Sequence, residues 1–535
     1  MCRVKQIASW LGALSILLMT ALATAADFET ELKTLSKGSY SKKALAVQAL
    51  SEIDDERVLP TLQVMLDGRL YIVKSGGAIV AEEGDSFRNI IDDEMVTYSR
   101  GQVKKIRINN RLRRALRTAL ASIEIKSKVA DVRKSSVQNL IKSPDKGLRP
   151  LIFEAYKKEK IPVIKELMGV ALATIDISSD DQETRLKAVD ILSLTVEPAA
   201  VSLLQQLMAK DEEGKYVEQD AEVVAAAESA LKKVNGKIRV YSFIETVFFG
   251  LSLGSVLLLA AIGLAITFGV MGVINMAHGE MIMLGAYTTF AIQQIFPQWI
   301  EASILIAIPA AFLVSGAVGV IIERTIIRHL YGRPLETLLA TFGVSLFLQQ
   351  LVRTFRSNNV AVVTPDWMSG MLEINGALGF TYNRLFIIIF SLLVLGLLVL
   401  LLKKTLLGLQ MRAVTQNRAM ANSMGIRSSW VDALTFGLGS GIAGIAGVAL
   451  SQITNVGPNM GQQYIIDSFM VVVFGGVGNL LGTFFAAMSL GVVNKFLEPA
   501  MGAVVAKIMM LIFIILFIQW RPRGLFALKG RFVED

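Results

Sequence analysis

Residues 243–268 read FIETVFFGLSLGSVLLLAAIGLAITF, a stretch of 26 residues with one formal charge, Glu245. About 20 predominantly apolar residues are enough to cross the hydrocarbon core of a bilayer as a helix, so this stretch predicts a membrane span. Eight further candidate spans follow it, at 272–296, 300–322, 335–352, 383–402, 430–452, 465–482, 483–496 and 503–520. The pair 465–496 is the least regular of these, because glycines interrupt it and its second member is short. The expected fold class is therefore an all-α, polytopic membrane domain of eight to nine spans over residues 239–535.

The charged residues lie mostly before this region. Of the 99 Asp, Glu, Lys and Arg residues, residues 1–240 carry 70 and residues 241–535 carry 29. The first part has an ordinary globular composition, whereas the second is too apolar to leave its surface in water. The net charge of +9 comes without a basic run or interleaved aromatic residues, so no nucleic-acid partner is expected. A Gly-x-x-x-x-Gly-Lys-Ser/Thr phosphate loop is also absent from the sequence, so any energy from ATP must come through another polypeptide.

The N-terminus has the pattern of a secretory signal peptide, residues 1–26. Arg3 and Lys5 precede an apolar run at 7–22, and small residues up to Ala26 offer a cleavage site at Ala25 or Ala26. The alternative is an uncleaved signal anchor, and in both cases the segment that follows is exported. The only cysteine, Cys2, precedes the apolar run, so a lipoprotein is not indicated. If cleavage occurs, the mature chain has no cysteine, and disulfides, thiol catalysis and thiolate metal sites are excluded.

The exported segment, residues 27–238, is expected to form a helical-repeat domain. Its apolar residues recur at helical spacing in pairs of short segments separated by Asp or Pro turns, at 41–66, 132–151 and 184–207. Antiparallel helix pairs with apolar inner faces predict a HEAT-like α-solenoid; the alternative is a helical domain without repeats. Residues 70–73 and 78–80, separated by Lys-Ser-Gly-Gly, predict one β-hairpin inserted in the domain. The segment has no His or Cys and no catalytic constellation, which indicates an interaction domain.

The distribution of Lys and Arg predicts the orientation of the spans. Starting outside, twelve basic residues fall in inner loops and four in outer loops. The inner ones are Arg324, Arg328, Arg333, Lys403, Lys404, Arg412, Arg418, Arg427, Arg521, Arg523, Lys529 and Arg531, and the outer ones are Arg353, Arg356, Arg384 and Lys495. This positive-inside bias agrees with the signal peptide and places the N-terminal domain outside and the C-terminus in the cytoplasm.

One polar stretch between two apolar segments is the candidate solute pathway. Residues 269–280 read GVMGVINMAHGE, and its Asn275, His278 and Glu280 are unexpected in this setting unless they line a pathway or pack at a broken helix. A plain polar loop at the inner surface is the other interpretation. No residue of the chain is predicted to hold a metal or a cofactor.

Glycines mark a second region. Gly437, Gly441, Gly444 and Gly447 have small-xxx-small spacings that let helices approach closely, so they are expected to serve helix packing. The stretch 476–482, GVGNLLG, superficially resembles a dinucleotide fingerprint, but its spacing is wrong and no βαβ unit surrounds it. It is expected to be a helix break or a packing contact.

The longest basic inner loop, residues 403–429, is the candidate contact with an ATPase. Its central part is predicted to be helical from Met411 to Met424 and to stop at Gly425, a residue type that often ends helices. Arg412 and Arg418 are expected to face acidic groups of the partner, and exposed methionines would add adaptable apolar contact. The alternative is that the arginines only fix the topology.

These motifs resemble those of a known family, the branched-chain amino acid ABC importer permeases of the LivH type. The resemblance covers about residues 243–530, and its segments are Gly263–Tyr287, Arg412–Asn417 with Ala421 and Gly425–Ile426, Val471–Gly482 and Arg521–Leu525. An extra exported domain of about 200 residues is similar to the arrangement in the urea-transporter branch, the UrtB type. The broader importer class has a Glu-Ala-Ala-x-x-x-Gly coupling loop. Here Ala419-Met420-Ala421 precede Gly425, so the glycine is present and the glutamate is absent.

The resemblance implies a bacterial inner-membrane permease subunit without its own ATP-binding site. Its implied partners are a second related permease, two cytoplasmic ABC ATPases and a periplasmic solute-binding protein, and the implied coupling residues are Arg412, Arg418, Ala421 and Gly425. The expected solute is small and polar, with urea or a short amide first, because the domain arrangement is similar to that of the urea-transporter branch. The few formal charges inside the spans are compatible with a neutral solute and equally with a zwitterion bound elsewhere. The alternatives are a branched-chain amino acid permease and a passive channel or secondary transporter with an exported regulatory domain. A membrane-anchored sensor or scaffold is a further possibility.

Overall fold

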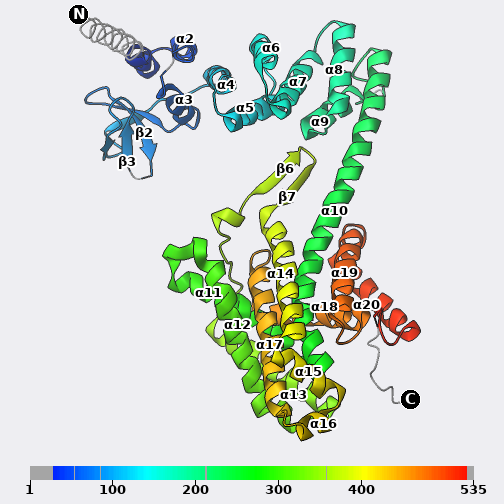
Figure 1. Cartoon of the computed structure of the whole chain (residues 1–535). Coiled ribbons are helices and arrows are strands. Elements are labelled where there is room, and N and C mark those ends of the chain that lie inside the picture. Colours follow the sequence, from blue (N-terminus) through cyan, green and yellow to red (C-terminus); the bar gives the residue numbers. More distant parts are fainter. Residues whose placement is uncertain (1–27, 54, 85, 211–213, 357, 527–535) are drawn as a thin grey trace, which may run out of the picture. The chain divides into compact units, whose positions relative to one another are not determined.

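The computed structural model describes residues 28–53, 55–84, 86–210, 214–356 and 358–526 (Figure 1). The expected signal peptide, residues 1–26, and two of the basic residues used for orientation, Lys529 and Arg531, lie outside the described residues. Internal contacts divide the chain into an N-terminal unit, Met1–Lys237, and a membrane unit, Ile238–Asp535. Each unit is considered by itself.

Helices make up most of the N-terminal unit. After a helical stretch at 28–37, its helices are α2 Tyr40–Leu50, α3 Val58–Leu66, α4 Asn110–Ile125, α5 Ala130–Lys142, α6 Arg149–Lys158, α7 Pro162–Asp176, α8 Gln182–Leu194, α9 Pro198–Leu207 and the first part of α10 Ala221–Met271, with a 3₁₀ turn at Lys146–Leu148. Side chains cap several of them: Asn109 accepts a hydrogen bond from the Leu112 N–H (2.8 Å) and Asp181 from the Thr184 N–H (2.9 Å). A proline in the first turn of α6, α7 and α9 suits a position where no N–H is needed.

The helix pairs expected from the sequence are part of larger, three-helix groups. The pairs are α2/α3, α5/α6 and α8/α9, and each is followed by a further helix, α4, α7 and α10 respectively. The third helix of one group packs against the first helix of the next, as α4 does on α5 and α7 on α8. The additional helices were missed although α4 shows the expected spacing, with Leu112, Leu116 and Leu120 all buried on one face.

A five-stranded antiparallel sheet replaces the single hairpin that the sequence predicted. Its strands are β1 Leu70–Val73, β2 Ile79–Glu83, β3 Ser86–Asn89, β4 Met95–Val96 and β5 Val103–Lys105, in the order β4-β3-β2-β1-β5. The hairpin is present as β1 and β2, with Leu70 opposite Ala81. Val73, Val80, Phe87 and Val103 form a small apolar cluster on the sheet. The expectation of a lone hairpin was wrong because β3, β4 and β5 have only two to four residues each, too few to show an alternating pattern, and they become strands by pairing within the sheet.

The membrane unit is helical apart from one β-ribbon. Its helices are the rest of α10, then α11 His278–Ile295, α12 Ile300–Thr325, α13 Pro334–Phe355, α14 Tyr382–Lys404, α15 Leu406–Gln416, α16 Arg418–Ser423, α17 Ser428–Ser451, α18 Met460–Gly475, α19 Leu480–Met501 and α20 Ala503–Trp520. Short 3₁₀ turns lie at Pro297–Trp299, Ile327–His329 and Asp366–Met368. The ribbon, β6 Met371–Asn375 with β7 Leu378–Thr381, was not predicted.

Within the described residues, seven helices are long and apolar enough to cross a membrane: α10, α12 with its flanking turns, α13, α14, α17, α19 and α20. This is the polytopic helical architecture expected, with fewer such helices than the eight to nine spans predicted. The other two predicted spans correspond to α11 and α18, which have 18 and 16 residues. At 1.5 Å per residue they are about 27 and 24 Å long, less than the roughly 30 Å hydrocarbon core.

The boundary predicted between residues 482 and 483 was wrong. The chain breaks earlier, between the end of α18 at Gly475 and the start of α19 at Leu480. Gly476 and Gly478 have φ values of +103° and +80°, which residues with a Cβ rarely adopt. Asn479 then caps α19 by accepting hydrogen bonds from the Leu481 and Gly482 N–H groups (3.1 and 3.2 Å). The stretch 476–482 is thus a helix break, one of the two outcomes expected for it.

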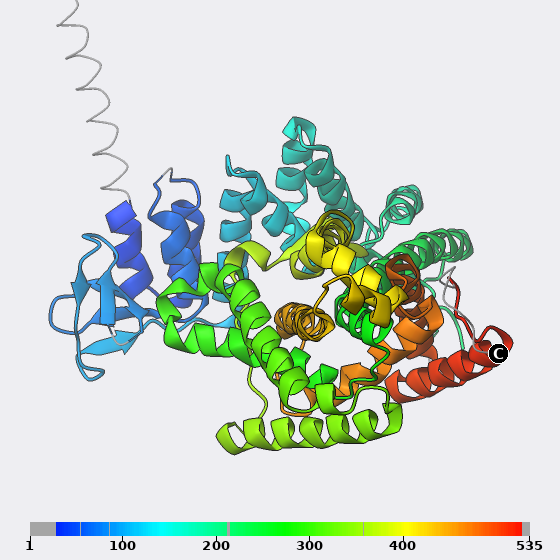
Figure 2. The same ribbon diagram turned by 60° about the horizontal axis from the view of Figure 1, so that its bottom comes forward.

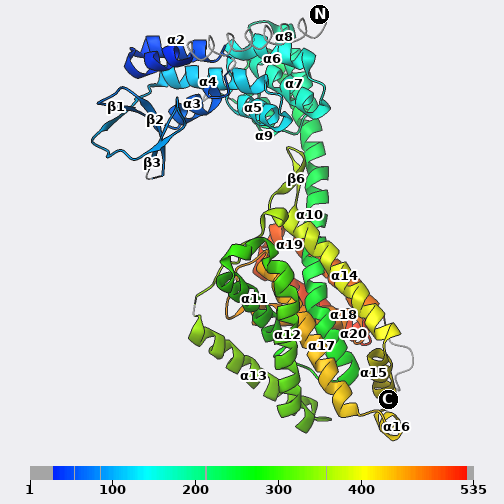
Figure 3. The ribbon, with the colours of Figure 1, turned by 60° about the vertical axis from the view of Figure 1, so that its left-hand side comes forward.

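Helix α17 is the centre of the membrane unit. Nearly all of its side chains are buried, and it packs extensively on both α11 and α12. Figure 2 brings the lower end of this unit forward and shows α17, in orange, surrounded by the other helices. Helix α13 lies at the margin of the bundle (Figure 3).

Candidate functional site

The polar stretch of the sequence lies at a break between two helices. Helix α10 ends at Met271, Gly272 has a φ of +68°, and α11 begins at His278. Asn275, His278 and Glu280 are all buried, with 0–1% of each residue exposed. The interpretation of this stretch as a loop at the surface is therefore wrong, because burial in the helical bundle removes these side chains from solvent.

Glu280 receives hydrogen bonds from α13. Its Oε1 accepts from the Ser345 hydroxyl (3.0 Å) and from the Gln349 amide (2.7 Å). Its other carboxylate oxygen, Oε2, is buried and has no hydrogen-bond partner. A buried acceptor without a partner is costly, so this oxygen is available for a ligand or a proton. Gly461 of α18 closes the opposite side, since a Cβ there would lie 2.8 Å from the Glu280 Cδ.

Asn275 and His278 fix the geometry of the break. Asn275 Oδ1 accepts from the Ala277 N–H (3.0 Å), and its Nδ2 is buried without a partner. His278 Nε2 lies 2.9 Å from the Ala260 carbonyl oxygen of α10. Because a carbonyl only accepts, Nε2 carries the proton, which makes Nδ1 an acceptor in the neutral ring; Nδ1 is also buried without a partner.

The structure adds residues of α13 that the sequence analysis did not select. Thr341 donates to the Leu338 carbonyl (3.0 Å) and accepts from the Met276 N–H (3.2 Å), while Ser345 and Gln349 hold Glu280. A signal was present in the sequence, because Thr337, Thr341, Ser345 and Gln349 are spaced four residues apart within a predicted span. That spacing gives one polar helical face.

The four glycines of α17 selected from the sequence lie where other helices leave no room for a side chain. A Cβ added to Gly437 would lie 2.6 Å from Val320 Cγ2, one on Gly441 would lie 2.7 Å from the Phe312 ring, and one on Gly444 would lie 2.6 Å from the Ala311 carbonyl oxygen. A Cβ on Gly447 would meet the backbone of Ile282 and Ala286 in α11. These glycines thus set the distance of α17 from α11 and α12.

The inner loop forms two helices instead of the one predicted over 411–424. Helix α15 ends at Gln416, and Asn417 takes an extended conformation and caps α16 by accepting from the Met420 N–H (2.9 Å). Asn417 breaks the helix because its side chain competes for backbone N–H groups. Gly425 has a φ of +88°, with open space around its Cα.

The two arginines of the loop are in different settings. Arg412 is exposed and donates to the Leu402 carbonyl. Arg418 is not free to meet a partner's carboxylate, as had been expected, because it forms an ion pair with the buried Asp432 of α17. Its guanidinium also lies 3.9 Å from the centroid of the Tyr331 ring. Arg418 thus attaches α16 to α17 and to the connection between α12 and α13.

The apolar residues of the loop are likewise divided. Met420 and Met424 are 60% and 76% exposed, whereas Met411 is buried at 1% and Ala421 at 5%. Met411, which was expected to offer contact to a partner, instead packs in the core of the membrane unit. Met420 and Met424, together with the exposed Leu406 and Leu409 of α15, form the available apolar surface.

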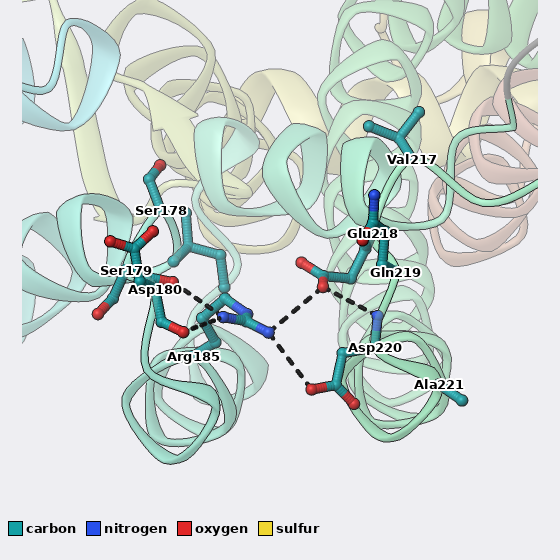
Figure 4. A pocket seen from close by; sticks show the side chains of 10 residues that line it. Ser178, Ser179, Asp180, Arg185, Val217, Glu218, Gln219, Asp220 and Ala221 are labelled. Atoms are coloured by element: carbon teal, nitrogen blue, oxygen red, sulfur yellow. Dashed lines mark hydrogen bonds and ion pairs between the residues drawn. The ribbon is translucent and has the colours of Figure 1, made fainter.

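The N-terminal unit has an open, polar surface pocket of about 640 Å³ between the α7–α8 turn and residues 217–221 (Figure 4). Arg185 dominates it: the guanidinium donates to the Ser179 and Asp180 carbonyls (2.9 and 3.0 Å) and pairs with Glu218 and Asp220 (3.4 and 3.3 Å). Arg185 therefore connects the α7–α8 turn to residues 218–220, although its Nε is buried without a hydrogen-bond partner.

Arg133 makes the same arrangement 52 residues earlier. It donates to the Ser127 and Lys128 carbonyls (2.9 and 3.1 Å) and pairs with Glu159 (2.8 Å). Both arginines occupy the fourth position of the first helix of a three-helix group. The repetition indicates a structural role for both. No group of three or more His, Cys, Asp or Glu residues is placed to bind a metal ion in the part of the chain that the structure describes.

The fold and the buried polar break define a membrane-spanning transport subunit. Residues 246–518, half of the chain, match the family described as the branched-chain amino acid transport system / permease component. The chain belongs to this family, whose members are ABC-transporter subunits without an ATPase site of their own and work in the membrane with ATPase and solute-binding partners.

Curated relatives agree with the family assignment. The chain is 31% identical to the high-affinity branched-chain amino acid transport system permease protein BraD of Pseudomonas aeruginosa, over 54% of this chain and 96% of that protein. It is 30% identical to the permease protein LivH of Salmonella typhimurium (53% and 95%), and 27% identical to a probable LivH of Methanocaldococcus jannaschii (51% and 88%). No solved structure matches the chain. Because the relatives are matched almost completely by about half of this chain, the rest has no counterpart in them.

Proposed function

We propose that the chain is the permease subunit of an ATP-driven importer that carries a small polar solute, with branched-chain amino acids as the first candidates. The family match carries this proposal, and the relatives named above favour amino acids as the solute. The subunit would lie in a bacterial inner membrane beside a second related permease, above two ATPases and below a solute-binding protein. The N-terminal unit would face the periplasm and the C-terminus the cytoplasm.

The proposed solute pathway passes the break between α10 and α11. Asn275, His278 and Glu280 each bring a buried polar atom without a protein partner to this break. In a membrane, polar groups of this kind are costly and usually serve a pathway or a polar contact. The two oxygens of Glu280 and the amide of Asn275 offer hydrogen bonds to a solute that has N–H and C=O groups.

Urea is the second candidate, for two reasons. The half of the chain without a counterpart in the branched-chain permeases sets it apart from them. The side chains that bond Glu280 are neutral, and a neutral amide needs hydrogen bonds but no counter-ions.

The proposed contact with the ATPase is formed by α15 and α16. Its exposed surface includes Met420, Met424 and Arg412 together with Leu406 and Leu409, and Ala421 packs the inner side of α16. Gly425 follows α16 in the left-handed backbone conformation, so Gly425→Val should strain the backbone at this position by about 1–3 kcal/mol. Expected results are reduced co-purification of the ATPase and reduced uptake; wild-type values of both would remove the loop from the mechanism.

Reconstitution tests the function. The chain and its partner subunits would be placed in liposomes with the solute-binding protein, and uptake of labelled leucine and of labelled urea would be measured with ATP and with a non-hydrolysable analogue. We expect one of the two solutes to be taken up, and its uptake to require ATP hydrolysis. Equal uptake without hydrolysis would indicate a passive channel, and uptake driven by an ion gradient alone would indicate a secondary transporter.

A reporter fusion tests the orientation. Alkaline phosphatase fused near residue 150 is expected to be active, because it requires export to fold. Activity of a cytoplasmic reporter at the same position would contradict the proposed topology.

A further inference from the structure

Helix α13 has its polar side turned inward. Thr337, Thr341, Ser345 and Gln349, here called the polar stripe, are 0–6% exposed. The opposite face carries large apolar side chains, among them Leu335, Leu339, Phe347 and Phe355, which are 65–82% exposed. A helix whose apolar side faces outward and whose polar side faces the protein suits a lipid-facing helix that lines a polar seam.

The attachment of α13 to the bundle combines apolar and polar contacts, because Leu348 is buried in the core of the membrane unit and Val344 packs against that core. Among the described helices, α11 is the one with which α13 shares substantial packing, and Figure 3 shows α13 at the margin. In the polar stripe, Ser345 and Gln349 donate to Glu280, and Thr341 accepts from the Met276 N–H. Thr337 donates to the Leu330 carbonyl in the turn that precedes α13. At the outer end, Arg353 donates to Asn459 (2.8 Å). Hydrogen bonds between membrane helices contribute about 0.6–2 kcal/mol each, less than close packing of the kind that α17 makes.

Helix α13 begins after a residue that can change its backbone angles. Gly332 precedes the helix with a φ of +81° and open space around it. Gly343, in the middle of the helix, is exposed. The helix is therefore held by a small number of contacts, hydrogen bonds at the polar stripe and apolar packing at Leu348, and it starts at a flexible backbone position.

The interface between α11 and the polar stripe contains polar atoms that lack hydrogen-bond partners. Glu280 Oε2 and Asn275 Nδ2, an acceptor and a donor, are buried on the α11 side of the stripe. Both need hydrogen bonds that the protein alone does not provide. A small solute with N–H donors and a carbonyl or carboxylate acceptor supplies them.

We infer that α13 is the movable wall of the solute pathway, and that solute passes between α11 and the polar stripe, where Glu280, Ser345 and Gln349 bind its N–H groups. This inference rests on the proposed transport function. The N–H groups belong to the ammonium of an amino acid or to the amide of urea, and the experiment below separates these two.

Cysteine accessibility tests the inference, since the chain has one native cysteine, Cys2, and a Cys2→Ser background removes it. Ser345→Cys, Thr341→Cys and the matched control Leu346→Cys would be made in the assembled transporter. Leu346 adjoins Ser345 but is 46% exposed on the outer face. A membrane-impermeant methanethiosulfonate reacts with a thiolate, which forms in water and not in lipid.

During ATP hydrolysis, Ser345→Cys and Thr341→Cys are expected to react at least tenfold faster than Leu346→Cys. The transported solute, leucine or urea, should slow this reaction, and the other should not. A transporter that takes up solute while both stripe cysteines stay as inert as the control would overturn the inference and leave the proposed function intact. A complex with no ATP-driven uptake of either solute would overturn both.

Discussion

Gly444→Ala tests whether close packing of α17 determines the stability of the membrane unit. The new Cβ would lie 2.6 Å from the Ala311 carbonyl oxygen, where ordinary contact begins near 3.4 Å, so α17 and α12 would have to separate by about 0.8 Å. Movement away from α12 is opposed on the other side, because Gly285 of α11 already lies against the Gly444 backbone. A gap of 0.5–1 Å forfeits about a quarter to a half of the dispersion energy of the atoms involved. Overpacking of this kind costs about 1–3 kcal/mol, and we expect the upper half of that range.

Gly396→Ala is the matched control, because Gly396 lies inside α14 with nothing within 4 Å of an added Cβ. There, alanine should be neutral or stabilise the helix by up to about 1 kcal/mol. The assay is the thermal midpoint of the detergent-solubilised protein, followed by size-exclusion chromatography of the heated samples. Gly444→Ala should lower the midpoint and Gly396→Ala should not. Equal midpoints for the two variants would refute the packing argument.

Three other variants examine the polar break, the inner loop and the N-terminal unit. Glu280→Gln should lower uptake at least tenfold at an unchanged membrane level, and unchanged uptake would exclude a role for the charge. Arg418→Glu leaves the buried Asp432 facing a like charge, which should cost about 3 kcal/mol of stability and reduce ATPase-driven uptake. Exchanging the two residues should restore part of that uptake. Normal uptake in the single variant, together with no rescue by the exchange, would contradict the role given to the pair. The hydrogen bond from Arg133 holds the pKa of Glu159 below its usual value. The stability from this pair is therefore present above about pH 4.3 and is lost as the pH falls through the lowered pKa. Over that pH range, amide hydrogen exchange in residues 127–161 should become faster, after correction for intrinsic rates. Glu159→Gln should abolish that pH dependence.

The helices of the membrane unit could be predicted because long apolar runs have few other possible structures. Their limits were less certain, as the break at Gly476–Asn479 shows. The sequence indicates that glycines interrupt the run, but only the positive φ values and the Asn479 cap decide where α18 ends and α19 begins. In the N-terminal unit, strands such as Val103–Lys105 carry almost no local signal, because their pairing with distant residues creates them.

Only some residues of the candidate site could be predicted from the sequence. Asn275, His278 and Glu280 could be selected because polar groups are costly in an apolar setting. Ser345 and Gln349 escaped notice because such residues occur in many spans, and only the packing shows that they face Glu280. The sequence also could not predict how exposed each individual side chain is to solvent.

Arg418 illustrates why position in a sequence did not reveal function. A basic residue in an inner loop is consistent with topology, with a partner contact or with an internal ion pair, and the buried Asp432 decides for the last. This pair attaches α16 to α17, and the glycines of α17 fasten that helix to α11 and α12 without slack. If an ATPase displaced α16, α17 and α11 would therefore move together with it, with little of the displacement absorbed between the helices. Helix α13 begins after the flexible Gly332 and meets the bundle through the hydrogen bonds of Glu280 and the packing of Leu348. It is the element that such a movement would leave behind.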